Sequence, residues 1–293
     1  MSLTPELSLM YTWDSNIGQN ITNYADGYAT PTISLTLYRS SGPVTTMLCS
    51  EVNYENHVLS RDPNLNAPFL YFWGMFKYSF SSWEMKVLGY YSDYFSPDWQ
   101  LTKVRYKVAP GVEKEIGRSE FSLDIPLSVY DYGGFRDDHL IFEVEGEYLF
   151  DFKVLKSWNF AVREISLSAG YEMKSFFVKS DESSGDEEAA YQAIGGKISG
   201  EIKLWRFALE PSFDISRKIY DKRDNHTRTE KLTRRVNMYY DLGLDCEVEL
   251  SDFLTLELGG VYKIKQSTYS IYDYRRYVFD TRLTLEPKFV LSE

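Results

Sequence analysis

The sequence predicts an all-β fold, a transmembrane antiparallel up-and-down β-barrel of about fourteen strands, with about twelve to sixteen as the range. Three observations predict it. Apolar and polar residues alternate along the whole chain, and the links between the alternating segments are long and short by turns. Aromatic residues make up 16% of the chain, with 24 Tyr, 18 Phe and 6 Trp. Such barrels carry aromatic girdles at both membrane interfaces, which accounts for this aromatic content. We expect one barrel domain over residues 1–293.

Composition narrows the alternatives. The mean hydropathy is -0.36. The chain contains no run of about 18 apolar residues, so the sequence predicts no transmembrane helix. A barrel tolerates this value because only every second strand residue meets lipid. The net charge of -11 disfavours nucleic-acid binding, which needs a basic face. Two cysteines make no disulfide framework, and alternation places Cys49 inward and Cys246 outward, so we expect free thiols.

The alternating segments follow one another along the whole chain. We expect strands over 5–14, 31–39, 44–56, 68–80, 83–94, 99–108, 119–130, 139–154, 160–177, 190–204, 205–217, 233–249, 253–265 and 276–290. The segment 68–80 is apolar on both faces, which leaves its register open. The segment 99–108 is basic on one face.

The clearest strand covers 139–154. One face of it carries Phe142, Val144, Gly146, Tyr148, Phe150 and Phe152, and the other carries Glu143, Glu145, Glu147 and Asp151. Successive strand residues point to opposite sides of a sheet. The segment 233–249 repeats the arrangement. A soluble β-sandwich also alternates in this way, so the connections must decide between the two folds.

Long links near 15–30, 57–67, 131–138, 178–189, 218–232 and 266–275 alternate with short ones near 40–43, 81–82, 155–159, 204–205 and 250–252. Outer-membrane barrels have short periplasmic turns and long outer loops. The alternation fails at 94–98 and 109–118, where a bent strand through Pro110 and Gly111 would explain it. The polar link 218–232 is the candidate plug or gate of the pore.

Charged residues on one strand face predict the pore wall, because a Lys or Arg facing lipid costs about 2–4 kcal/mol at the midplane. The expected acidic pore-lining residues are Glu143, Glu145, Glu147, Asp151, Asp241, Asp245 and Glu247. The expected basic ones are Lys103, Arg105, Lys107, Lys197, Lys203, Arg206, Arg282 and Lys288. Either these charges pair across neighbouring strands, or separate acidic and basic arcs select ions. Net acidity favours a weak cation preference.

The chain resembles the monomeric porins of the porin G type, and it is also similar to the oligogalacturonate-specific porins. The resemblance rests on length, hairpin rhythm, Met10-Tyr11, Asn23-Tyr24-Ala25-Asp26-Gly27, Ser41-Gly42-Pro43 and Tyr106-Lys107-Val108-Ala109-Pro110. It implies a wide, non-specific, monomeric channel. The histidine gate of porin G is not carried over, because 233–249 and 253–265 contain no His. Barrels of this kind end on an aromatic residue, and Phe289 is an imperfect equivalent.

The sequence contains few of the residue patterns that enzymatic sites require. The histidines are His57, His139 and His226, at loops or strand ends, with no spacing that predicts a metal site. Asp137-Asp138-His139 lacks the second acidic pair of an outer-membrane protease, and no His has Ser at plus two as in the barrel lipid hydrolases. We therefore expect no enzyme, cofactor or metal. The aromatic cluster Tyr90, Tyr91, Tyr94, Phe95 and Trp99 indicates an interface girdle or, alternatively, a sugar-stacking surface.

The expected function is a passive outer-membrane porin for small hydrophilic solutes or ions, oligosaccharides among them, in contact with membrane lipid. No signal peptide is recognisable, and we expect the chain to be a mature protein of the bacterial outer membrane. A barrel enzyme, another barrel without a transport role and a soluble all-β binding protein remain as alternatives. A continuous apolar outer face would separate the porin from the soluble protein.

Overall fold

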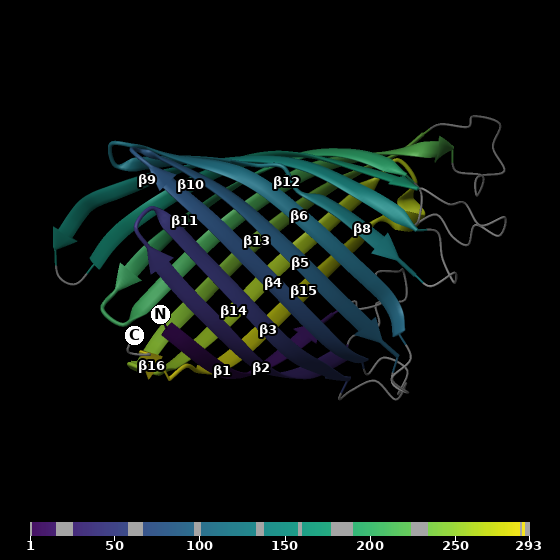
Figure 1. Cartoon of the computed structure of the whole chain (residues 1–293). Coiled ribbons are helices and arrows are strands. Elements are labelled where there is room, and N and C mark those ends of the chain that lie inside the picture. Colours follow the sequence, from purple (N-terminus) through teal and green to yellow (C-terminus); the bar gives the residue numbers. More distant parts are fainter. Residues whose placement is uncertain are drawn as a thin grey trace.

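The computed structural model describes residues 2–15, 26–57, 67–96, 101–132, 138–157, 160–176, 190–223, 234–287 and 289–290. They form a closed antiparallel barrel of fourteen strands, which confirms the predicted fold (Figure 1). Among these residues, no helix is long and apolar enough to cross a membrane.

The strands are β1 (Ser2–Asp14), β2 (Asp26–Ser41), β3 (Val44–His57), β4 (Ala67–Phe80), β5 (Trp83–Phe95), β6 (Leu101–Ile116), β7 (Ser119–Asp124), β8 (Leu127–Asp131), β9 (His139–Ser157), β10 (Phe160–Phe176), β11 (Tyr191–Leu204), β12 (Phe207–Arg223), β13 (Arg234–Ser251), β14 (Leu254–Ser267), β15 (Tyr274–Leu285) and β16 (Phe289–Val290). A 3₁₀ turn, η3 (Ser270–Tyr272), precedes β15. Segments β7 and β8 are two parts of one barrel strand, since both pair with β6 and β9. Segment β16 continues the line of β15 along β1.

Each strand pairs with its neighbours in sequence, and the barrel closes where β1 meets β15. Their register runs from Leu7 opposite Leu285 to Asp14 opposite Val278. Closure leaves no free strand edge, so backbone groups along the wall are hydrogen-bonded between strands. This is the arrangement that a strand-built membrane protein requires.

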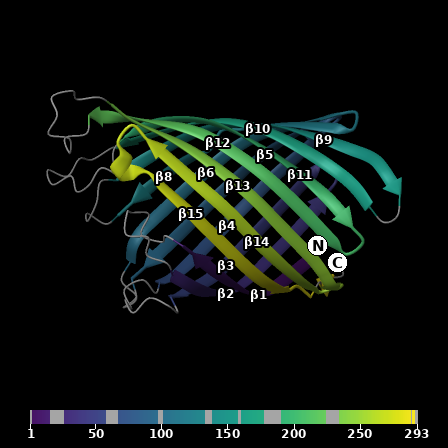
Figure 2. The same cartoon turned by 180° about the vertical axis from the view of Figure 1, so that it is seen from behind.

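Two-residue turns link the strands at one end of the barrel, which we call the turn end. They are Gly42–Pro43, Ser81–Ser82, Gly117–Arg118, Trp205–Arg206 and Asp252–Phe253. Four of them begin with a residue at positive φ, namely Gly42, Ser81, Gly117 and Trp205, as tight hairpin turns require. The start of β1 and β16 also lie at the turn end (Figures 1 and 2). The opposite end, where the longer connections leave the strands, is called the loop end.

The bounds of β6 explain why the predicted alternation of long and short links fails at 109–118. The sequence predicts its end at residue 108, but β6 continues through Pro110 and Gly111 to Ile116. The turn after it therefore has two residues, and the alternation of long and short links holds throughout. The irregularity lies instead in the next strand, where Ile125 and Pro126 separate β7 from β8. There the Ile125 N–H donates to the Pro110 carbonyl at 2.9 Å.

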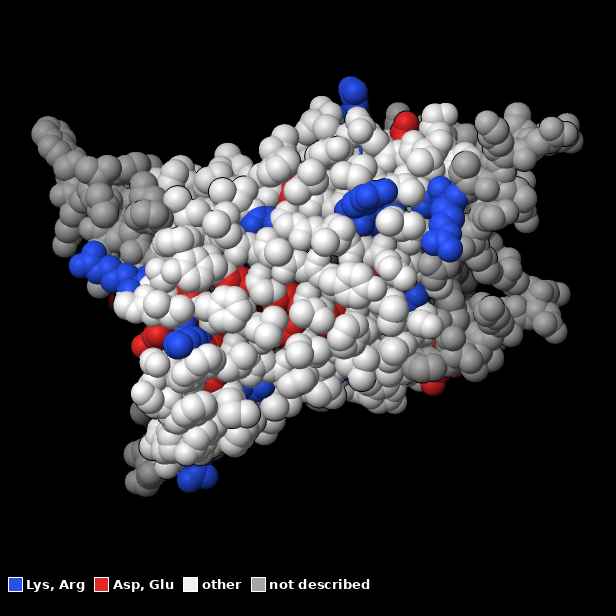
Figure 3. Space-filling view, turned by 90° about the horizontal axis from the view of Figure 1, so that it is seen from above, with Lys and Arg blue, Asp and Glu red and all other residues white. Residues whose placement is uncertain are grey.

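The two faces of the wall differ in chemistry. Large apolar side chains such as Ile33, Leu244 and Phe279 point away from the barrel and are exposed. They alternate with polar and charged residues on the inner face. Figure 3 shows one side of the barrel, on which uncharged residues cover most of the surface. Strand β4, whose register the sequence leaves open, points Phe72 and Phe76 outward.

Candidate functional site on the inner wall

The predicted acidic ladder lies on the inner face of β9. Glu143, Glu145 and Glu147 stand opposite Glu172, Gly170 and Ser168 of β10. Because successive members are two positions apart in the strand, all three side chains share one side of the sheet. Glu147 accepts a hydrogen bond from the Ser166 hydroxyl. Only the backbone of Asp151 is described, and its side chain lies outside the described residues.

The basic residues of β6 share the inner face with this ladder. Lys107 Nζ lies 3.7 Å from Glu143 Oε2, so the two charged groups pair across the wall. Nearer the loop end, Lys103 Nζ lies 3.8 Å from the centroid of the Tyr94 ring. Arg105 lies over the Tyr130 ring at 5.1 Å. These cations therefore contact aromatic rings in addition to carboxylates.

The late strands carry the second predicted acidic set. Asp241 Oδ2 lies 3.5 Å from Lys263 Nζ. Asp245 shares space with Asp280, since a Cβ on Gly259 would lie 2.8 Å from Asp245 Oδ1 and 2.5 Å from Asp280 Oδ1. Glycine at 259 thus lets two carboxylates of β13 and β15 approach across β14. Glu247 stands opposite Glu257 on the same inner face.

The remaining predicted basic residues differ in their positions and in their partners. Lys203 and Arg282 pair with neighbouring carboxylates, Glu249 at 3.3 Å and Glu257 at 3.7 Å. Arg206 does not lie on a strand, because β12 begins at Phe207 and Arg206 belongs to the turn before it. Its guanidinium donates to the Leu250 carbonyl at 3.4 Å. Lys288 lies outside the described residues.

The structure therefore interleaves acidic and basic residues more than two separate arcs would. Four of the predicted residues form ion pairs with side chains one or two strands away: Lys107, Lys203, Asp241 and Arg282. Such pairs satisfy charges on the wall and are worth about 0–1 kcal/mol each where water reaches them.

The aromatic cluster of β5 divides between the two faces. Tyr91 lies on the outer face, as a girdle residue would, with Tyr106 5.3 Å away. Tyr90 and Tyr94 lie on the inner face, opposite Lys107 and Lys103. Their neighbours on β4 extend the inner aromatic surface, and Phe69 meets Tyr94 edge to face at 5.0 Å. Trp99 lies outside the described residues.

Of the predicted histidines, His139 has a described side chain. It is buried at the loop end and stacks on Tyr130 and Tyr132, with centroids 4.6 and 5.6 Å away. The adjacent Asp138 accepts a hydrogen bond from the Tyr132 backbone N–H. Asp137 and His226 lie outside the described residues, as does the His57 side chain. Among the described residues, no group of three or more metal-ligating side chains converges.

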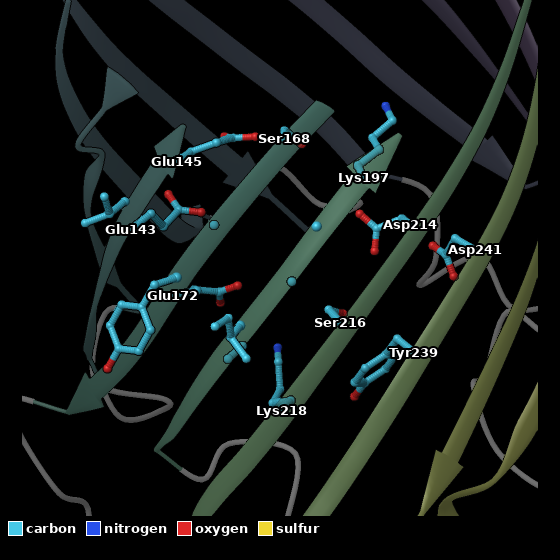
Figure 4. Close-up of a pocket in the computed structure, with 17 residues that line it drawn as sticks. Glu143, Glu145, Ser168, Glu172, Lys197, Asp214, Ser216, Lys218, Tyr239 and Asp241 are labelled. Atoms are coloured by element: carbon cyan, nitrogen blue, oxygen red, sulfur yellow. The ribbon is translucent and has the colours of Figure 1, made fainter. Parts of the chain in front are cut away.

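A recess of about 350 Å³ lies in the inner wall over β9–β13. Its floor is Gly170, Gly195 and Ser216, direct neighbours on three adjacent strands. A Cβ on Gly195 would lie 2.8 Å from Ser216 Cβ, so glycine lets the floor lie flat. Larger polar side chains surround the floor (Figure 4): Glu143, Glu145, Glu172, Lys197, Asp214, Lys218, Tyr239 and Asp241.

Solved structures share this architecture. The chain is similar to a bacterial polysaccharide outer membrane secretin, with a TM-score of 0.55, 12% identity and coverage of 96% of this chain and 97% of that one. It is also similar to an anion-selective porin from Comamonas acidovorans, with a TM-score of 0.55, 6% identity and coverage of 97% and 98%. The outer membrane channel DcaP of Acinetobacter baumannii matches with a TM-score of 0.53, 10% identity and coverage of 97% and 96%.

No family model matches the chain, and no curated protein matches it. At these identities the likeness establishes the fold. The likeness in fold to these three outer-membrane proteins covers 96–97% of the chain.

Sequence reasoning missed an ionic network at the turn end. Lys86 Nζ lies 2.7 Å from Glu113 Oε1 and 3.0 Å from Asp124 Oδ2. Lys77 Nζ joins it at 2.9 Å from Glu113 Oε2 and also contacts Glu84. Glu113 lies in a segment that the sequence predicts as a link, so its inner position was hidden. Recognising β6 as one strand to residue 116 would have placed Glu113 in phase with Lys107.

Proposed function

We propose that the protein is a porin of the bacterial outer membrane, a passive channel for small hydrophilic solutes and ions. One observation carries the proposal. Fourteen strands close into a barrel whose outer face is apolar and whose inner face is charged. Water and solutes are the natural contents of a charged interior, and lipid is the natural surrounding of a continuous apolar exterior. Barrels larger than about eight strands leave a lumen beyond what side chains fill.

The predicted acidic and basic residues of the inner wall are part of this proposal as pore-lining groups. On the inner face of the described strands, carboxylates outnumber ammonium and guanidinium groups, in keeping with the net charge of -11. Rings of fixed negative charge favour cations. We therefore include a weak cation preference.

The proposal includes oligosaccharides among the solutes because of the aromatic side chains on the inner face. Phe69, Tyr71 and Trp73 alternate on the inner face of β4, and Tyr90 and Tyr94 lie beside them on β5. Tyr71 and Tyr90 have ring centroids 5.7 Å apart. Half-buried aromatic rings provide apolar surfaces, with polar tips on Tyr and Trp, which suit the faces of sugar rings. The proposal includes a monomeric channel without enzymatic activity.

The porin proposal is tested by single-channel recording of the detergent-refolded protein in a planar bilayer under a KCl gradient. Stable current steps with a reversal potential displaced toward that of K⁺ are expected. A displacement toward Cl⁻ would assign control to the Lys and Arg side chains. Protein that stays soluble and monomeric without detergent and inserts nowhere would overturn the proposal.

A further inference from the structure

Two lysines in the recess of β9–β13 differ from the ion-paired lysines of the inner wall. Elsewhere on the wall, Lys86, Lys107 and Lys263 each pair with a carboxylate one or two strands away. Lys197 and Lys218, which line the recess, form no ion pair with any carboxylate in the described part of the chain. Two ammonium groups therefore face a hollow with their charge uncompensated by a direct partner.

Tyr191 fixes the edge of the recess nearest the loop end. This ring is buried, and its hydroxyl donates a hydrogen bond to the Glu172 carboxylate. Lys218 Nζ lies 3.6 Å from the centroid of the same ring. One tyrosine thus holds an anion on β10 and a cation on β12, on either side of Ala193. A site whose charged groups are held before the ligand arrives binds with a smaller ordering cost.

The charges are placed at a spacing that suits a dipolar molecule. Glu172 and Lys218 both stand opposite Ala193, so two strand spacings separate them, about 10 Å between backbones. Glu145 and Lys197 form a second couple of opposite sign on the two sides of β10, where Glu145 stands opposite Gly170 and Lys197 stands opposite Ser168 (Figure 4).

Resting on the proposed porin function, we propose that this recess binds small zwitterionic solutes with one ammonium and one carboxylate group, of amino-acid to dipeptide size. The carboxylate pairs with Lys218 or Lys197, and the ammonium group pairs with Glu145 or Glu172. The flat floor of Gly170, Gly195 and Ser216 accommodates the backbone of the solute. A volume of about 350 Å³ lies at the lower end of the range of about 300–1,000 Å³ for small-molecule sites.

A dication or a dianion fits less well. A dianion would meet the five carboxylates that line the recess, which is destabilising in a partly desolvated site, and a dication would leave the ammonium groups of Lys197 and Lys218 without an anionic partner. The mixed rim therefore selects for a molecule that carries both signs. This selection is separate from the weak cation preference, which depends on the summed charge of the wall.

The test compares two probes of similar size in liposome-swelling assays, zwitterionic glycylglycine and uncharged N-acetylglycinamide. With the wild-type protein, glycylglycine flux should saturate with concentration, and N-acetylglycinamide flux should rise linearly. In the double variant Lys197→Gln with Lys218→Gln, the concentration that half-saturates glycylglycine flux should rise at least about fivefold, or saturation should vanish. Ser216→Leu, which fills the floor without removing charge, should have the same effect.

The matched control is Lys114→Gln with Arg217→Gln. It also removes two positive charges, but from the outer face, where Lys114 lies over Trp83. This variant should leave the saturation of glycylglycine flux unchanged. Linear glycylglycine flux in the wild type, with both probes permeating, would overturn this inference and leave the porin proposal intact. Permeation of neither probe would overturn the porin proposal, and the inference with it.

Discussion

At the scale of single residues, Gly111 shows how the wall accommodates its charges. A Cβ there would lie 2.0 Å from Asp124 Oδ1 and 2.7 Å from Lys86 Cε. The Lys86–Asp124 ion pair therefore crosses β6 directly over this glycine. The sequence marks Pro110-Gly111 as a disturbance in a strand. It does not show that the glycine makes room for a side-chain contact between two other strands, because that contact depends on register.

We predict that Gly111→Ala destabilises the barrel by about 1–3 kcal/mol, the usual cost of forcing extra atoms into a packed site. The Lys86–Asp124 pair must separate to admit the methyl group. Urea unfolding in phospholipid vesicles measures the change. Gly89→Ala is the matched control on the adjacent strand, since the nearest atom to its Cβ would be 3.9 Å away and little change is expected. Equal losses in both variants would contradict this account.

At the scale of elements, alternation predicts most strands because each has one face toward each environment. The centres of β9 and β13 follow directly from their apolar and acidic faces. The predicted span of β6 ends too early, at residue 108, because Pro and Gly usually end strands; the alternative of a strand that continues through Pro110 and Gly111 is the one that the structure has. The prediction that Arg206 lies on a strand is wrong because the chain turns at Trp205 and Arg206. The tight turn takes Trp205 at φ 56°, a conformation that local sequence does not indicate.

The seam between β1 and β15 closes the barrel, and an ion pair strengthens it. Arg276 Nη2 lies 2.6 Å from Asp14 Oδ2, and the Asp14 side chain is only 2% exposed. We predict that Asp14→Ala costs about 3–5 kcal/mol, because it leaves the guanidinium partly buried without its carboxylate.

Thermal loss of the compact band in electrophoresis without boiling measures this cost. The double variant Asp14→Leu with Arg276→Met should recover part of the loss, since it removes both charges together. A double variant no more stable than Asp14→Ala alone would show that the ion pair is not the cause.

At the scale of the whole molecule, one face of every strand must meet lipid if the barrel spans a membrane. Leu244 is 54% exposed on the outer face of β13. We predict that Leu244→Arg lowers the stability of the folded barrel in vesicles by about 2–4 kcal/mol, the cost of an arginine near the bilayer midplane. Ser212→Arg on the inner face of β12 is the control, and its expected change is under about 1 kcal/mol. Similar losses at both positions would contradict the assignment of the faces.

The proposed function requires that the inner face of this barrel line a water-filled conducting pore, and charged thiol reagents applied during single-channel recording test this most directly. In a background of Cys49→Ser and Cys246→Ser, the neighbours Ser199→Cys and Ile198→Cys place one thiol inside and one outside, since Ile198 is 46% exposed on the outer face. A cationic methanethiosulfonate should change the current in one step for Ser199→Cys and leave Ile198→Cys unaffected. Identical responses of the two variants, or the absence of any stable current, would contradict the claim.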